Sequence, residues 1–114
     1  MRIKMDWIGK VILTGAVLTG GFLSTSVKAD NTAEPTYKTK CAACHGPDGK
    51  GETSIGKTNK IRDLASADVQ KQSDDDLAGV IASGKGKMPA YAKSLKPDQI
   101  KGLVAYIRSL GKKS

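Results

Sequence analysis

The sequence is poor in the large apolar side chains that usually fill a protein core. Its 114 residues include one Phe, one Trp and three Tyr, and both the Phe and the Trp lie within the first 29 residues. Small domains bury a low fraction of their surface, and many depend on a bound group or a cross-link for stability. We therefore expect a bound group to supply much of the core, and we expect the chain to fold poorly without it.

Cysteine and histidine are equally scarce. The sequence has two Cys and one His, and all three lie within residues 41–45, CAACH. This is the C-x-x-C-H pattern at which a c-type haem is attached. Each thiol can add across one haem vinyl group, and the adjacent His can bind the iron through an imidazole nitrogen. The pattern predicts covalent attachment at Cys41 and Cys44 and iron ligation by His45.

Three other interpretations of these five residues compete with haem attachment. A structural zinc site needs four protein ligands, and the chain offers only three Cys and His residues. A thioredoxin-like redox pair shares the C-x-x-C spacing but needs flanking strands, which the sequence does not predict. A pair of buried structural cysteines remains the third alternative, because free Cys is often a core residue.

The N-terminal residues have the features of an export signal. A basic start containing Arg2, Lys4 and Lys10 precedes an uncharged apolar run of 13 residues, 11–23. The run is shorter than the roughly 20 residues that span a bilayer. Small residues at positions 27 and 29 predict a signal peptide of residues 1–29, cleaved after Ala29. An uncleaved membrane anchor and a buried core helix are the alternatives.

Residues 30–114 are then expected to form one exported, periplasmic domain. The leader carries four of the 19 basic residues and one of the 11 acidic residues, so the formal net charge falls from +8 to +5 when it leaves. The remaining pattern predicts helices over residues 32–45, 66–72, 73–84 and 96–110, and a loop over residues 46–63. The acidic run at residues 74–76 indicates a helix N-terminus in preference to a cation site.

Met88 is the second candidate ligand. Met1 starts the chain and Met5 lies in the leader, so Met88 is the only methionine of residues 30–114. It lies in an irregular segment, residues 84–91, and is followed by Pro89, which restricts the backbone. A thioether can fill the sixth position of a haem iron that already has one His ligand. We predict axial ligation by Met88; a core-filling Met is the alternative.

Three segments, CAACHGPDGKG, GKGKMPAY and LVAYIRSLGK, occur in this order, and with them residues 33–111 resemble class I (mitochondrial-type) monohaem cytochromes c of bacteria. The resemblance implies an all-α fold of about four helices around one covalently attached haem c. It also implies that the first and last helices cross, with Ala33 and Tyr37 near Tyr106. The thioether, proximal and distal positions of the family fall on Cys41 and Cys44, on His45 and on Met88.

Two common features of that family are missing. Many members have a Gly-Pro pair whose Pro carbonyl accepts a hydrogen bond from the ligand His, and no such pair occurs in residues 53–64. Many members also have a Trp near the haem propionates, and residues 30–114 contain none. The acceptor for His45 and the fine control of the reduction potential therefore stay unassigned.

These observations together predict a soluble one-electron carrier rather than an enzyme. Its iron would cycle between Fe(III) and Fe(II) with both axial positions filled, and it would pass electrons between respiratory partners. Two alternatives remain: a haem domain that binds a small gas or peroxide after Met88 is displaced, and a tethered cytochrome subunit of an oxidase. We expect a monomer.

Basic residues on both sides of Met88 suggest the kind of partner. Lys85, Lys87, Lys93 and Lys96 could form a docking surface for an acidic redox protein such as a membrane oxidase or reductase. Ordinary solvated lysines are the alternative. Nucleic acid is a poor candidate, because the chain is expected to be exported and to lack exposed aromatic residues interleaved with its basic ones.

Overall fold

The computed structural model describes residues 15, 20–21 and 32–113. The predicted signal peptide and its cleavage position fall outside the described residues, apart from Gly15, Gly20 and Gly21. Within the described part, six helices and no strand are found: α1 (Ala33–Lys40), α2 (Ala42–His45), α3 (Ser54–Thr58), α4 (Ala67–Gln70), α5 (Asp74–Ser83) and α6 (Pro97–Lys112). The predicted all-α class is confirmed. None of these described helices has the length and hydropathy needed to cross a membrane.

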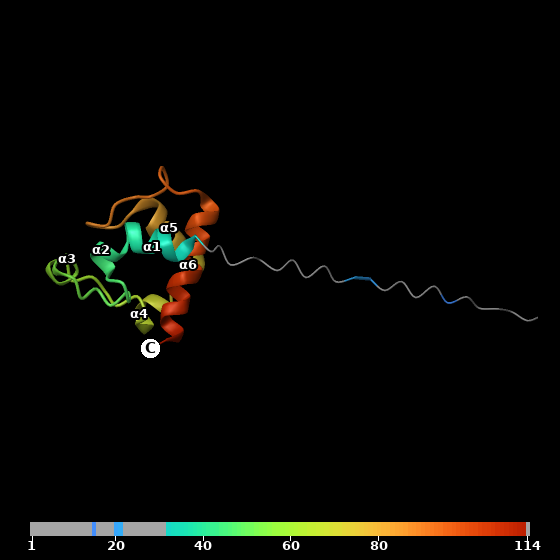
Figure 1. Ribbon diagram of the computed structural model, residues 1–114, viewed down its shortest axis with the longest axis horizontal. Helices are drawn as coiled ribbons and strands as arrows, with labels where there is room; N and C mark the ends of the chain where they lie inside the picture. Colours follow the sequence, from blue (N-terminus) through green and yellow to red (C-terminus); the bar gives the residue numbers. More distant parts are fainter. Residues whose placement is uncertain (1–14, 16–19, 22–31, 114) are drawn as a thin grey trace, which may run out of the picture.

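The first and last helices cross, as expected. Figure 1 shows α1 lying across α6, with α5 beside them. At the crossing, the rings of Tyr37 and Tyr106 have centroids 4.8 Å apart and are tilted by 43°. Tyr37 is 1% exposed, and its hydroxyl donates a buried hydrogen bond of 2.7 Å to the carbonyl of Gly46. The crossing therefore also fixes the turn that follows the C-x-x-C-H residues.

The predicted helix over residues 32–45 is wrong in one respect, because it is interrupted at Cys41. Cys41 has φ −115°, and the amides of Cys44 and His45 both donate to its carbonyl, at 3.2 and 2.9 Å. The helical hydrogen-bond pattern therefore starts again within the motif, as the short helix α2. Gly46 then ends α2 with φ +83°, a conformation that favours glycine.

Helices α5 and α6 begin where local capping signals predict. The Ser73 hydroxyl accepts a 3.0 Å hydrogen bond from the Asp76 amide, and Gly84 ends α5 with φ +75°. Pro97 occupies the first turn of α6, and the Gln99 side chain accepts from the Lys96 amide at 2.9 Å. The inner face of α6 is buried at Ile100, Leu103, Val104, Ile107 and Leu110.

The segment predicted as loop, residues 46–63, contains helix α3, and the predicted helix over residues 66–72 is shorter. Thr53 explains the first difference, because its Oγ1 accepts from the Gly56 amide at 2.8 Å and donates to the Cys44 carbonyl at 2.8 Å. This one side chain caps a single turn and ties it to α2. Helix α4 occupies only Ala67–Gln70, after which the chain turns towards α5.

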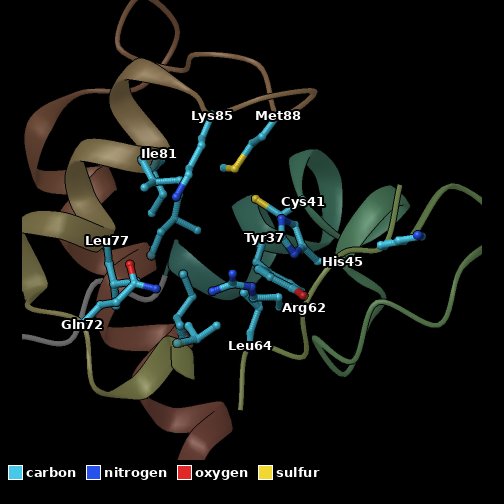
Figure 2. Close-up of a pocket in the computed structure, with 15 residues that line it drawn as sticks. Tyr37, Cys41, His45, Arg62, Leu64, Gln72, Leu77, Ile81, Lys85 and Met88 are labelled. Atoms are coloured by element: carbon cyan, nitrogen blue, oxygen red, sulfur yellow. The ribbon is translucent and has the colours of Figure 1, made fainter. Parts of the chain in front are cut away.

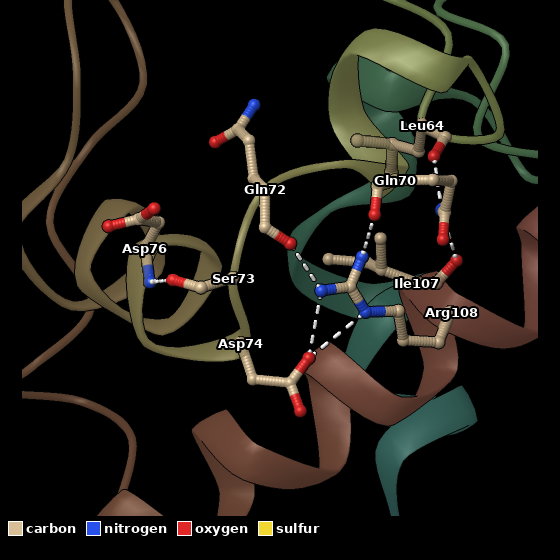
Figure 3. Close-up of polar contacts among 8 residues, drawn as sticks. All are labelled: Leu64, Gln70, Gln72, Ser73, Asp74, Asp76, Ile107 and Arg108. Atoms are coloured by element: carbon tan, nitrogen blue, oxygen red, sulfur yellow. Dashed lines mark hydrogen bonds and ion pairs between the residues drawn. The ribbon is translucent and has the colours of Figure 1, made fainter.

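Arg108 on α6 holds the turn between α4 and α5 (Figure 3). Its guanidinium donates to the carbonyls of Gln70 and Gln72, at 2.7 and 2.5 Å, and pairs with Asp74 at 2.9 Å. The Gln70 side chain donates in turn to the carbonyls of Leu64 and Ile107, at 2.7 and 3.1 Å. Together these contacts attach α4, the start of α5 and the preceding loop to one face of α6.

Candidate haem site

Residues from several parts of the chain converge on a cavity beside the core (Figure 2). Cys41 and His45 reach it from the C-x-x-C-H segment, Leu77 and Ile81 from α5, and Met88 from the irregular segment that follows. The cavity has a volume of about 310 Å³. Most of the other residues that line it are apolar: Tyr37, Leu64, Val69, Val80, Leu103 and Ile107. A flat apolar group would therefore complete the core here.

A second cavity, of about 340 Å³, lies against the same motif. Cys41, His45, Lys85 and Met88 line both cavities, whereas Cys44 lines only the second. The second cavity is more polar at its rim, where Lys40, Asn59, Lys87 and Tyr91 contribute. All four predicted site residues are thus brought to one place in the fold, although Met88 is far from the others in sequence.

His45 has the properties expected of a neutral ligand. Burial lowers its pKa, so the imidazole loses its proton more readily than in solution. Its Nδ1 is buried and has no hydrogen-bond partner among the described residues. No carbonyl of the described chain therefore supplies the acceptor that the sequence also failed to provide. An imidazole that burial keeps neutral, at the wall of a largely apolar cavity, suits a ring that binds a metal-containing group.

The segment after His45 folds back tightly over α2. The Gly51 amide donates to the His45 carbonyl at 2.7 Å, and a Cβ at Gly56 would collide with the backbones of Gly51 and Cys44. Glycine is required at position 56 because two chain segments touch there. This close packing holds the His45 side of the cavities, and nothing in the sequence pattern indicated it.

The Met88 segment is fixed to the end of α5. Lys85 and Met88 exchange two backbone hydrogen bonds of 3.2 and 3.0 Å, and a Cβ at Gly84 would collide with the Met88 carbonyl. Further along, the amides of Tyr91 and Ala92 donate to the carbonyls of Ile81 and Ala82, each at 3.0 Å. These bonds hold Met88, which is half-buried, at the boundary of both cavities.

Cationic side chains line the first cavity among the apolar ones. Lys60, Arg62 and Lys85 contribute to its wall, and Figure 2 shows Arg62 beside Tyr37 and Leu64. Sequence reasoning did not select Lys60 or Arg62, because single basic residues in a polar loop carry no distinctive pattern. Haem carries two propionate groups, so an apolar cavity with cations in its wall fits that molecule better than a purely apolar one.

The thiols are free in the polypeptide, and they differ in surroundings. Burial raises the pKa of the Cys41 thiol, which keeps it protonated, while Lys40 acts weakly in the opposite direction. Cys44 lines the more polar second cavity. Both cysteines therefore line the space that a bound group would occupy, as thioether attachment needs.

The predicted lysine surface is only partly assembled at the site. Exposed Lys85 and Lys87 line the second cavity, and they are joined there by Lys40, which was not selected from the sequence. Lys93 and Lys96 are exposed but line neither cavity. The basic rim therefore consists of Lys40, Lys85 and Lys87, on both sides of the opening between the C-x-x-C-H and Met88 segments.

Comparisons with known proteins agree with this site. Residues 28–107 match the family described as "Cytochrome C oxidase, cbb3-type, subunit III". The chain is 34% identical over 110 residues to a cytochrome c6 of Nostoc sp., covering 95% of each protein. It is 41% identical over 75 residues to the cbb3-type cytochrome c oxidase subunit CcoP of Rubrivivax gelatinosus, covering 65% of this chain and 24% of that subunit.

A solved structure gives the same result. The KustC0563 c-type cytochrome superposes with a TM-score of 0.64 at 31% identity, over 68% of this chain and 95% of that one. The chain spans about a quarter of the CcoP subunit, but nearly the whole of the cytochrome c6. The expected resemblance is confirmed: this chain belongs to the cytochrome c family, as a class I monohaem electron carrier with covalently attached haem c.

Proposed function

We propose that Cys41 and Cys44 hold the haem through thioether bonds and that His45 and Met88 are the axial ligands of its iron. The observation that carries this assignment is that Cys41, His45 and Met88 line the same two cavities. Burial keeps His45 neutral, and the hydrogen bonds around Met88 hold its thioether close to the motif. When bound, the haem supplies reversible one-electron chemistry.

The chain's own residues then set the properties of that chemistry. With His45 and Met88 both bound to the iron, no position would be left for a substrate, and a soft thioether would favour the reduced iron. We therefore propose a carrier and not a catalyst. Lys60, Arg62 and Lys85 would pair with the haem propionates and take the place of the missing Trp.

The exposed rim suggests how the carrier meets its partner. Exposed Lys40, Lys85 and Lys87 line the second cavity, which Cys41 and Cys44 line as well. A positive rim of this kind would steer an acidic redox protein towards the haem edge. We propose an exported, periplasmic domain of residues 30–114 with such a partner, a membrane oxidase or reductase, after removal of residues 1–29.

A second candidate follows from the family match. The matched family is described as a subunit of a cbb3-type oxidase, so the domain could serve as a tethered cytochrome with its leader retained. Intact mass separates the two candidates, because the free carrier loses residues 1–29 and the tethered form keeps them. In both cases the electron-transferring site would be the same.

Substitution of Met88 tests the ligand set in protein exported with its own leader. The wild type is expected to gain the mass of one haem and to show the weak far-red band of iron–sulfur ligation. Met88→Ala should lose this band and bind carbon monoxide rapidly when reduced. Met88→His is the matched control, because it should lose the band yet resist carbon monoxide and have a lower reduction potential.

Three results would count against the assignment. A colourless wild type with both thiols reactive would exclude haem attachment. A far-red band that survives Met88→Ala would exclude Met88 as the ligand. Rapid carbon monoxide binding by the wild type itself would favour the alternative of a gas-binding domain.

A further inference from the structure

One side-chain hydrogen bond joins the Met88 segment to the end of α1, directly before the attachment cysteines. The Tyr91 hydroxyl donates to the Lys40 carbonyl at 3.0 Å, across 51 positions of sequence. Lys40 is the last residue of α1 and directly precedes Cys41, and Tyr91 lies three residues after Met88. The bond therefore links the backbone next to one proposed haem attachment to the loop of the proposed distal ligand.

The break at Cys41 makes this acceptor accessible. In a continuous helix the Cys44 amide would donate to the Lys40 carbonyl, four positions earlier. Here the Cys44 amide donates to the Cys41 carbonyl instead, at 3.2 Å. The carbonyl of Lys40 is thus one of the helix-terminal acceptors that need a partner from elsewhere, and Tyr91 supplies it.

Tyr91 can hold the Met88 segment in place, because three hydrogen bonds fix its own backbone. Its amide donates to the Ile81 carbonyl at 3.0 Å, and its own carbonyl accepts from the amides of Ser94 and Leu95 at 3.0 and 2.8 Å. The half-buried ring lines the second cavity beside Met88. The residue therefore connects the end of α5 rigidly to the end of α1, across the mouth of that cavity.

A second contact crosses the same opening, but it is a weaker constraint. The Lys87 ammonium donates to the Asn59 side chain at 3.0 Å, and this bond, like the bond from Tyr91, is exposed. A lysine side chain loses several rotatable bonds to make such a contact, so it holds the two segments less firmly. Tyr91 has only two side-chain torsions, and its bond ends on backbone.

We propose that Tyr91 is a positioning residue whose hydroxyl holds the Met88 segment against the end of α1. This contact limits the replacement of Met88 by an external ligand. Tyr91 does not itself bind the haem iron. The inference rests on the proposed ligation by His45 and Met88. Removing a single net hydrogen bond should raise the affinity for a competing ligand about fivefold, which corresponds to about 1 kcal/mol at 25 °C.

The test uses the haem-loaded protein and imidazole as the competing ligand. Tyr91→Phe keeps the ring in the cavity wall and removes only the hydroxyl. We expect its ferric form to bind imidazole about fivefold more tightly than the wild type does, and to lose the far-red band at correspondingly lower imidazole concentration. The reduction potential should fall, because weaker sulfur ligation favours the reduced iron less.

The control is Thr39→Ala, which removes an exposed hydrogen bond of 2.8 Å from Thr39 to the Pro35 carbonyl within α1. This bond does not reach the Met88 segment, so imidazole affinity should stay within twofold of the wild type. Equal affinities in wild type and Tyr91→Phe, or an equal gain in Thr39→Ala, would overturn the inference alone. A wild type without the far-red band would overturn the ligand assignment and the inference together.

Discussion

The hydrogen bond from Tyr37 to Gly46 allows the sharpest prediction about stability. Tyr37→Phe would remove a buried 2.7 Å bond and leave the ring packed against Tyr106. The Gly46 carbonyl would not be left without a donor, because the Gly49 amide also donates to it at 3.1 Å. The loss is therefore that of one net hydrogen bond, about 0.5–1.5 kcal/mol, and not the larger penalty of an unsatisfied buried acceptor.

That free energy converts into a measurable change in melting temperature. For a domain of this size, 1 kcal/mol corresponds to a shift of about 4–8 °C. Thermal unfolding of the haem-loaded protein, followed by far-UV circular dichroism, should show a decrease of about that size for Tyr37→Phe. Tyr37→Ala also removes a ring that is 1% exposed, and it should cost about 3–5 kcal/mol.

The pH dependence gives a second check on the same bond. Burial raises the pKa of Tyr37, with smaller contributions from neighbouring groups, so the folded hydroxyl keeps its proton. A pKa that folding raises contributes stability below the unfolded value, near 10, and this contribution disappears as pH rises further. The advantage of wild type over Tyr37→Phe should therefore be constant from about pH 6 to pH 9.

The control for Tyr37 is the same change at its ring partner. Tyr106 is only half-buried, so Tyr106→Phe should alter stability by less than about 0.5 kcal/mol. Equal melting temperatures for wild type and Tyr37→Phe would refute the argument, because the bond would then contribute nothing. A loss above about 3 kcal/mol would also refute it, by showing that Gly49 does not support the carbonyl after Tyr37 is changed.

Two further predictions concern charged residues. Arg108→Ala should lower the free energy of unfolding in denaturant titrations by about 2–3 kcal/mol, because two carbonyls lose a charged donor. Asp74→Ala should cost at most about 1 kcal/mol, because the Asp74 side chain is 76% exposed. Equal costs for the two variants would contradict this. Exchanging Lys40, Lys85 and Lys87 for Glu should slow electron transfer at a carboxylate-coated electrode and weaken the salt dependence of its rate. The same exchange at Lys93, Lys96 and Lys101, which line neither cavity, should have neither effect. If both triple variants behave alike, the basic rim has no special role.

The helices that the sequence predicts best are those with local capping signals, although α6 continues to Lys112 and not only to residue 110. Ser73 and Gly84 bound α5, and Pro97 starts α6, so short-range capping and an apolar stripe were enough to place them. The break at Cys41 and the turn of helix at Thr53 were not predictable in this way. The Lys40 carbonyl next to the break is bonded to the distant Tyr91, and Thr53 is also bonded to the Cys44 carbonyl nine positions earlier, contacts that only the folded chain brings together.

The residues of the candidate site also fall into two groups, those that the sequence could select and those that it could not. Cys41, Cys44 and His45 are adjacent in sequence, and Met88 stands out as the single methionine of its domain, so residue type and spacing selected all four. Arg62 and Tyr91 could not be selected, because their roles arise from contacts across long stretches of chain. Arg62 is recognised only by its place in the cavity wall, and Tyr91 only by its bond to Lys40.

The scarcity of aromatic residues and the size of the cavity have one physical explanation. The first cavity is lined mainly by apolar side chains, and apolar surface left in contact with water costs free energy in proportion to its area. The 11 buried apolar residues of the described part of the chain make up only part of a core, and the haem supplies the rest. A chain that gains its core from a covalently attached group needs few large side chains of its own, and its fold becomes inseparable from its electron-transfer chemistry.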